Sequence, residues 1–160
     1  MTGCTTVRIA AFALSAGVAS LASPVEAQTV SGPAFEVDVT LSPAAAARLA
    51  NLRETIIVDA EFFGVPASPK LLAATQGRLD LAPERKIELS GAGVAHFPAP
   101  GYDASKLKLV QGGTAEVAIE GFSGRHSGPN NFLDCDYFED AVQLAASRPV
   151  QMHCKLIGEP

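Results

Sequence analysis

The chain contains no tryptophan, few aromatic residues and no long hydrophobic run. Its longest uncharged apolar stretch is Ile9–Leu21, about 13 residues, whereas a helix needs roughly 20 residues to cross the hydrocarbon core of a bilayer. We therefore expect no membrane span. Basic residues are also scarce, with 12 Lys and Arg against 17 Asp and Glu and a net charge of −5. Because nucleic acid and anionic lipid are bound by clustered cations, we expect neither as a partner.

The short apolar run has the features of a cleavable signal peptide. Met1–Arg8 carries one positive charge, the run follows it, and Val25 and Ala27 supply small residues before Gln28. This order of charged, apolar and small residues is typical of an export signal. We expect residues 1–27 to be removed by cleavage near Ala27/Gln28, which gives a periplasmic or secreted protein.

Cysteine is rare as well, with three in the chain. Cleavage removes Cys4 and leaves Cys135 and Cys154. In an oxidising compartment an isolated pair usually forms a disulfide, although a buried reduced pair or metal ligation remain alternatives. Closing this loop would stabilise the fold by roughly 3 kcal/mol in the chain-entropy model.

The remaining chain reads mainly as short strands. Apolar and polar residues alternate in Phe35–Leu41 and Val150–Leu156, and Thr55–Phe63 is rich in β-branched and aromatic residues, which predicts a central strand. Ser42-Pro43 offers an N-cap and a first-turn proline for a short helix to Leu52. The spacing of apolar residues in 138–147 predicts a second short helix.

Seven or eight short strands separated by Gly/Pro turns favour a mainly β fold. We expect an antiparallel immunoglobulin-like β-sandwich with one or two short helices, and a small β-barrel is the alternative. Residues 28–34 are expected to be a flexible lead-in, and residues 35–160 a single β-rich domain.

The stretch 123–132 is the most loop-like part of the chain and the candidate binding loop. Long polar loops on a rigid β scaffold often carry binding. The residues to inspect for binding are Arg125, His126, Asn130, Asn131 and Phe132. A small hydrolase using this loop is the alternative, but Gly121–Arg125 is not a G-x-S-x-G elbow and no catalytic residue is assigned.

A ligand- or metal-binding protein is the third hypothesis. The acidic cluster in residues 134–140 lacks the loop spacing of a calcium site, and we interpret it as the start of a helix, whose partial positive charge favours carboxylates. His153 and Cys154 are neighbours in a strand and point to opposite faces, which disfavours chelation of one ion. We expect no cofactor.

Several segments resemble a group of small exported bacterial proteins of unassigned function. These are Leu41-Ser42-Pro43, Thr55–Gly64, Asn131–Cys135 and Cys154–Ile157, and the similarity spans most of residues 35–157. The resemblance implies an exported β-rich domain with one disulfide and brings no activity with it. The function we expect is a non-catalytic structural or binding module, whose partner is an unknown protein or an envelope component.

Overall fold

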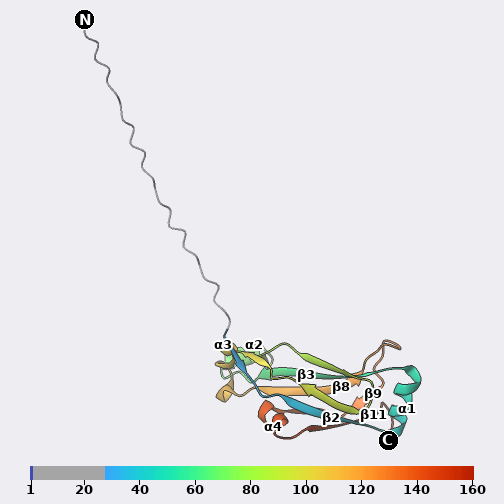
Figure 1. The fold of residues 1–160 in the computed structure, drawn as a ribbon. Helices are drawn as coiled ribbons and strands as arrows, with labels where there is room; N and C mark the ends of the chain where they lie inside the picture. The colour runs from blue at the N-terminus through green and yellow to red at the C-terminus, as the bar shows by residue number, and fades with distance from the viewer. Residues whose placement is uncertain (2–27) are drawn as a thin grey trace.

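The computed structural model describes Met1 and residues 28–160, so the predicted signal peptide lies outside the described residues. Residues 28–160 are mainly β structure with four short helices, and their two larger sheets face each other as a sandwich (Figure 1). Within this part of the chain no sheet closes into a barrel, so the alternative of a small barrel is not formed. None of its helices is long and apolar enough to cross a membrane.

The first layer is a five-stranded sheet built around β3 (Ile56–Gly64), which the sequence predicted as a central strand. Ile56, Val58, Ala60 and Phe62 are buried on the inner face of β3. The strand pairs of this sheet are antiparallel. The partners of β3 are β8 (Glu116–Ser123), β5 (Arg85–Leu89) and β4 (Leu79–Asp80), and β10 (Phe138–Ala141) extends the sheet beyond β8.

The second layer is a four-stranded sheet that brings the two ends of the described chain together. Its order is β6 (Gly93–Phe97), β2 (Phe35–Leu41), β11 (Val150–Leu156) and β9 (Leu133–Cys135). The strands β2 and β11 are parallel, which corrects the expectation of a purely antiparallel sandwich. Parallel neighbours require a long crossover, and here the intervening chain builds the whole opposite sheet.

A small third sheet lies at the N-terminal end of the described chain. Strand β1 (Thr29–Ser31) pairs with β7 (Gly101–Asp103), and the backbone N–H of Gly32 donates to the carbonyl of Pro100 at 2.8 Å. Residues 28–34, expected to be a flexible lead-in, therefore contain a hydrogen-bonded strand. Its three residues are all exposed, so no hydrophobic alternation marked it in the sequence.

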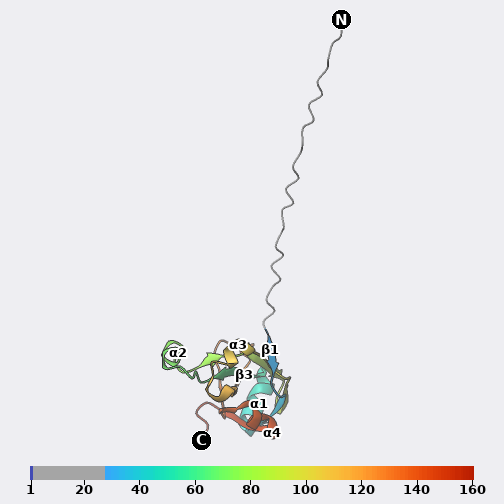
Figure 2. The same cartoon turned by 90° about the vertical axis from the view of Figure 1, so that its left-hand side faces the viewer.

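The helices lie at the ends and edges of the sandwich. Helix α1 (Pro43–Leu52) begins as predicted, with Ser42 Oγ accepting from the N–H of Ala45 at 3.0 Å. Figures 1 and 2 show α1 at one end of the molecule, with α2 and α3 at the other end and α2 projecting to the side. The remaining helices are α2 (Pro69–Ala74), α3 (Ala104–Leu107), α4 (Val142–Ser147) and the 3₁₀ turn Gln111–Gly113.

The helix predicted over 138–147 is correct only in its second half. Residues Phe138–Ala141 form the edge strand β10, in which Phe138 lies opposite Ile119 of β8, and the helix begins at Val142. The apolar spacing that predicted one helix belongs instead to a strand followed by a helix. Pairing with β8 overrode the local pattern, as tertiary contacts often do.

Candidate functional site

The candidate loop 123–132 wraps around the carboxylate of Glu54, a residue that precedes β3. Glu54 is 3% exposed. Its Oε2 accepts hydrogen bonds from the N–H and the hydroxyl of Ser127, at 2.8 and 2.7 Å, and its Oε1 accepts from the N–H of Thr55 at 3.0 Å. The carboxylate therefore holds the loop against the start of β3.

These hydrogen bonds control the ionisation of Glu54. Burial raises the pKa of the carboxyl, but the donors from Ser127, Thr55 and the His126 backbone outweigh burial and lower the pKa from 4.5 to about 2. Glu54 is consequently ionised at neutral pH and serves as an acceptor for the loop. Its donors occupy both oxygens, so the group acts as a structural anchor.

His126 is held by a second carboxylate. Its Nε2 lies 2.7 Å from Oε1 of Glu88, which also accepts from the hydroxyl of Thr55 at 2.7 Å. The hydrogen bond to Glu88 raises the pKa of His126, and the hydrogen bonds from Thr55 and His126 lower the pKa of Glu88. Both the imidazole and the carboxylate are exposed, so this pair contributes little stability.

Asn131 closes the loop at its base. Its Oδ1 accepts from the N–H groups of Ser123 and Leu133 at 2.9 and 3.1 Å, and its Nδ2 donates to the carbonyl of Leu133 at 2.8 Å. Phe132 packs against the core, with the guanidinium of Arg48 5.9 Å from its ring centroid. Two of the five candidate residues are thus part of the scaffold.

The other three candidates, Arg125, His126 and Asn130, are exposed. Arg125 lies over the ring of Phe122 at 5.5 Å, and His126 contacts Glu88. Among the hydrogen bonds of residues 28–160, no serine contacts the His126 ring, and the Ser127 hydroxyl is committed to Glu54. Among the described residues, the loop therefore does not form the serine–histidine pair of a serine hydrolase.

The cysteine pair lies next to this loop as a disulfide between β9 and β11. Cys135 and Cys154 face each other directly, with their sulfur atoms 2.06 Å apart, as the sequence predicted. Cys154 is fully buried. The bridge packs against Gly121 of β8, where an added Cβ would lie 2.9 Å from Cys135 Sγ. Only glycine leaves room for the disulfide between the layers.

The acidic residues of the cluster in residues 134–140 have separate partners in the structure. Asp134 lies opposite Lys155, Asp136 accepts from the N–H of His153 at 2.9 Å, and Asp140 accepts from the N–H of Ala141. The interpretation as a helix start is wrong, because β10 occupies this stretch. Within the part of the chain that the structure describes, no three His, Cys, Asp or Glu residues are placed to hold a metal ion.

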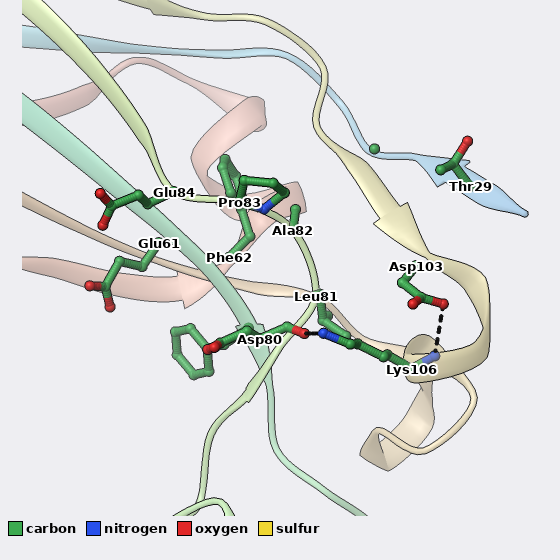
Figure 3. A pocket seen from close by; sticks show the side chains of 12 residues that line it. Thr29, Glu61, Phe62, Asp80, Leu81, Ala82, Pro83, Glu84, Asp103 and Lys106 are labelled. Carbon is green, nitrogen blue, oxygen red and sulfur yellow. Dashed lines mark hydrogen bonds between the residues drawn. The ribbon is translucent and has the colours of Figure 1, made fainter. Parts of the chain in front are cut away.

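A cavity of about 560 Å³ lies at the α3 end of the sandwich, between β3, β7 and the turn after β4. Its floor includes Phe62, Leu81 and Pro83, and Lys106 Nζ donates to the carbonyl of Asp80 at 2.9 Å. Figure 3 shows Glu61 and Glu84 pointing the same way, away from Lys106. Both glutamates line the cavity, and their carboxylates lie on the outer face of the five-stranded sheet.

That outer face carries most of the unbalanced charge of the protein. Inward residues of β3 and β8 are apolar, so the alternate residues point outward. Against its eight carboxylates stand Arg78, Lys86 and, at one edge, Arg125, which leaves five negative charges. The carboxylates of this acidic face are those of Asp59, Glu61, Asp80, Glu84, Glu88, Glu116, Glu120 and Glu139.

One part of the acidic face is neutralised by Arg78. Its guanidinium lies 3.6 Å from the centroid of the Phe63 ring and bridges Glu61 and Glu139, at 3.6 and 3.3 Å. Ala118 lies directly opposite both carboxylates in the register and leaves space for the guanidinium. This part of the face is therefore closed by a cation from the chain itself.

The cross-strand row formed by Lys86, Asp59 and Glu120 carries more negative than positive charge. Asp59 lies directly opposite Glu120 on β8 and opposite Lys86 on β5. Two carboxylates opposite each other in neighbouring strands repel. Lys86 contacts Asp59 at 3.3 Å and is shared with Glu84 at 2.9 Å. The side chain of Asp59 is 5% exposed, and its Oδ1 has no hydrogen-bond partner. Burial raises the pKa of Asp59, and Glu84 and Glu61 add to the rise against the opposing effect of Lys86.

The sequence analysis did not identify the acidic face. The signal was the alternation itself, because Asp59 and Glu61 share one face of their strand and Glu116 and Glu120 share one face of theirs. The sequence does not show that β3 and β8 are neighbours, nor which residues lie opposite each other. Only that register brings Asp59 against Glu120.

Comparison of the chain with family models, with curated proteins and with solved structures finds no match. The resemblance to small exported bacterial proteins therefore stays a prediction.

Proposed function

We propose that this protein is an exported, non-catalytic binding module whose acidic face binds a basic segment of a partner protein. The observation that carries the proposal is the row Lys86–Asp59–Glu120, in which Asp59 and Glu120 lie directly opposite each other and the ammonium group that contacts Asp59 is shared with Glu84. Such an arrangement costs stability on its own, and a cationic partner would offset the cost.

The compartment is part of the proposal. We infer that residues 1–27 are a signal peptide, cleaved near Ala27/Gln28, and that the mature protein is periplasmic or secreted. The disulfide between Cys135 and Cys154 supports this, since disulfides persist in oxidising compartments. The intact mass of protein secreted by cells that express the full chain tests it, and a mass that still includes residues 1–27 contradicts cleavage.

The framework that we propose for this binding module is of the immunoglobulin-like type. Two facing sheets and a parallel pairing of the first long strand with the last strand support the assignment. The disulfide differs from the inter-sheet bridge of antibody domains, because it joins neighbouring strands of one sheet. In such frameworks a rigid sheet presents side chains at fixed spacing, which suits recognition of charge by a face.

The alternative of a hydrolase at the 123–132 loop has less support. His126 contacts the carboxylate of Glu88, and Ser123 is fully buried with its hydroxyl 3.2 Å from Asn131 Oδ1. We propose instead that this loop is a rigid edge of the acidic face, since its His126 contacts Glu88 of that face.

The experiment is a titration of a fluorescein-labelled oligolysine peptide with the periplasmic protein, followed by anisotropy. The proposal predicts saturable binding that weakens as salt is added, because exposed charges are screened. An oligoserine peptide of equal length is the control. Absence of binding at low salt, or binding that is insensitive to salt, would contradict the proposed function.

A further inference from the structure

The carboxylate of Asp59 is unusual because it is buried, whereas the neighbouring acidic side chains Glu61 and Glu84 are exposed. Its side chain is 5% exposed, its Oδ2 lies 3.3 Å from Lys86 Nζ, and its Oδ1 has no hydrogen-bond partner. A buried carboxylate oxygen without a donor costs free energy, so a donor that reaches it is favoured.

The residues around Asp59 decide which kind of donor fits. Glu120 lies directly opposite, and Glu61 and Glu84 lie close enough to raise the pKa of Asp59. These carboxylates make a negative potential, yet in the described part of the chain no three of them are placed to chelate one metal ion. An ammonium or guanidinium group, with several N–H donors on a flexible stem, can bond two separated carboxylates.

Lys86 already shows this mode of binding. Its Nζ lies 3.3 Å from Asp59 and 2.9 Å from Glu84, and its side chain is about half exposed. Because Glu84 is itself exposed, Lys86 can keep that partner in solvent while it moves away from Asp59. The chain thus supplies a cation that a second cation can replace.

We propose that Asp59 and Glu120 form a subsite for one lysine or arginine side chain of the basic partner, and that Lys86 occupies the Asp59 position of this subsite in the unbound protein. This inference rests on the proposed function of the acidic face. It adds that one position on the face is specific, whereas the other carboxylates contribute to attraction at a distance. Binding exchanges one ion pair for another and breaks no covalent bond.

The first test compares two variants of the full chain in the oligolysine titration. Asp59→Asn should weaken binding about tenfold, the effect of losing a charge-assisted hydrogen bond. Asp38→Asn is the matched control, since Asp38 lies on the outer face of the other sheet and its side chain has no hydrogen bond among the described residues. It should change the affinity less than about twofold.

Stability separates a binding role of Asp59 from a structural one. Because the pKa of Asp59 is raised in the folded protein, ionisation at neutral pH opposes folding, and Asp59→Asn should not lower the thermal midpoint. Weaker binding with an unchanged or higher midpoint supports the subsite. Weaker binding with a clearly lower thermal midpoint would show that Asp59 stabilises the fold, and would overturn the subsite.

The second test removes the resident cation. Lys86→Met should strengthen peptide binding, and it should do so more than Arg85→Gln, which removes the same charge from the neighbouring position of β5. In the Asp59→Asn background the two substitutions should have equal effects. If Lys86→Met and Arg85→Gln strengthen binding equally in the wild-type background, only net charge matters and the subsite is refuted while the acidic face stands. If the wild-type protein does not bind the peptide at all, the proposed function itself fails.

Discussion

Replacement of Glu54 by glutamine tests how the 123–132 loop is held. The new side-chain amide would place an NH₂ group against the donors of Ser127 or Thr55, which now share the two carboxylate oxygens. The lowering of the Glu54 pKa from 4.5 to about 2 corresponds to about 3 kcal/mol of folding free energy. Because the glutamine carbonyl oxygen can still accept from one set of these donors, the expected loss is about 2 kcal/mol.

The pH dependence has a definite sign. A carboxylate whose pKa is lowered by folding stabilises the protein fully above its unfolded pKa of 4.5, and the contribution disappears as the pH falls toward 2. Glu54→Gln should therefore lower the free energy of unfolding by about 2 kcal/mol at pH 7, with a much smaller difference near pH 2.

Urea unfolding at neutral and acid pH measures this difference, and amide exchange at Gly124 and Ser127 reports the loop itself. Glu36→Gln is the control, because Glu36 is exposed and paired with an exposed His96, so its loss should cost less than about 0.5 kcal/mol. Equal stability of Glu54→Gln and wild type at pH 7, or a difference that persists undiminished near pH 2, would refute the reasoning.

Three further changes probe the interior. Tyr102→Phe should leave the free energy of unfolding unchanged or raise it by about 1 kcal/mol, because the Tyr102 hydroxyl is buried without a hydrogen-bond partner. Burial also raises the pKa of Tyr102 to about 12. A clear loss of stability in urea unfolding would contradict this expectation. Gly121→Ala should cost about 1–3 kcal/mol, since the new Cβ would lie 2.8 Å from Met152 Sδ, whereas Gly91→Ala meets open space and should cost less. Reduction of the Cys135–Cys154 bridge should lower the free energy of unfolding by about 3 kcal/mol, and two free thiols in the native protein would contradict the bridge.

The fold was predictable from the sequence where one residue pattern had one physical meaning. Strands β2 and β11 alternate because one face of each is buried, and Ser42-Pro43 marks the start of α1 since it satisfies the orphan donors of a first turn. Strand β10 was missed because four residues cannot distinguish an edge strand from a helical turn. Strand β1 was missed because it buries nothing and depends on β7 for its pairing.

Composition correctly predicted an irregular loop after β8, but the contacts of this loop could not be predicted. Its main anchor, Glu54, precedes Ser127 by 73 positions, and nothing near Glu54 in the sequence marks a buried carboxylate. Asn131 looked like a binding residue since it lies in a polar loop, whereas its side chain closes the base of that loop. The acidic face depends on the register of β3 with β8, which alternation within each strand does not determine.

The most direct test of the central claim is the salt-dependent affinity of the protein for oligolysine, measured for the wild type, Asp59→Asn and Asp38→Asn. The account predicts tight binding at low salt that weakens with added salt, a loss of about tenfold for Asp59→Asn and almost none for Asp38→Asn. Equal affinities for all three proteins, or no binding by the wild type, would contradict it.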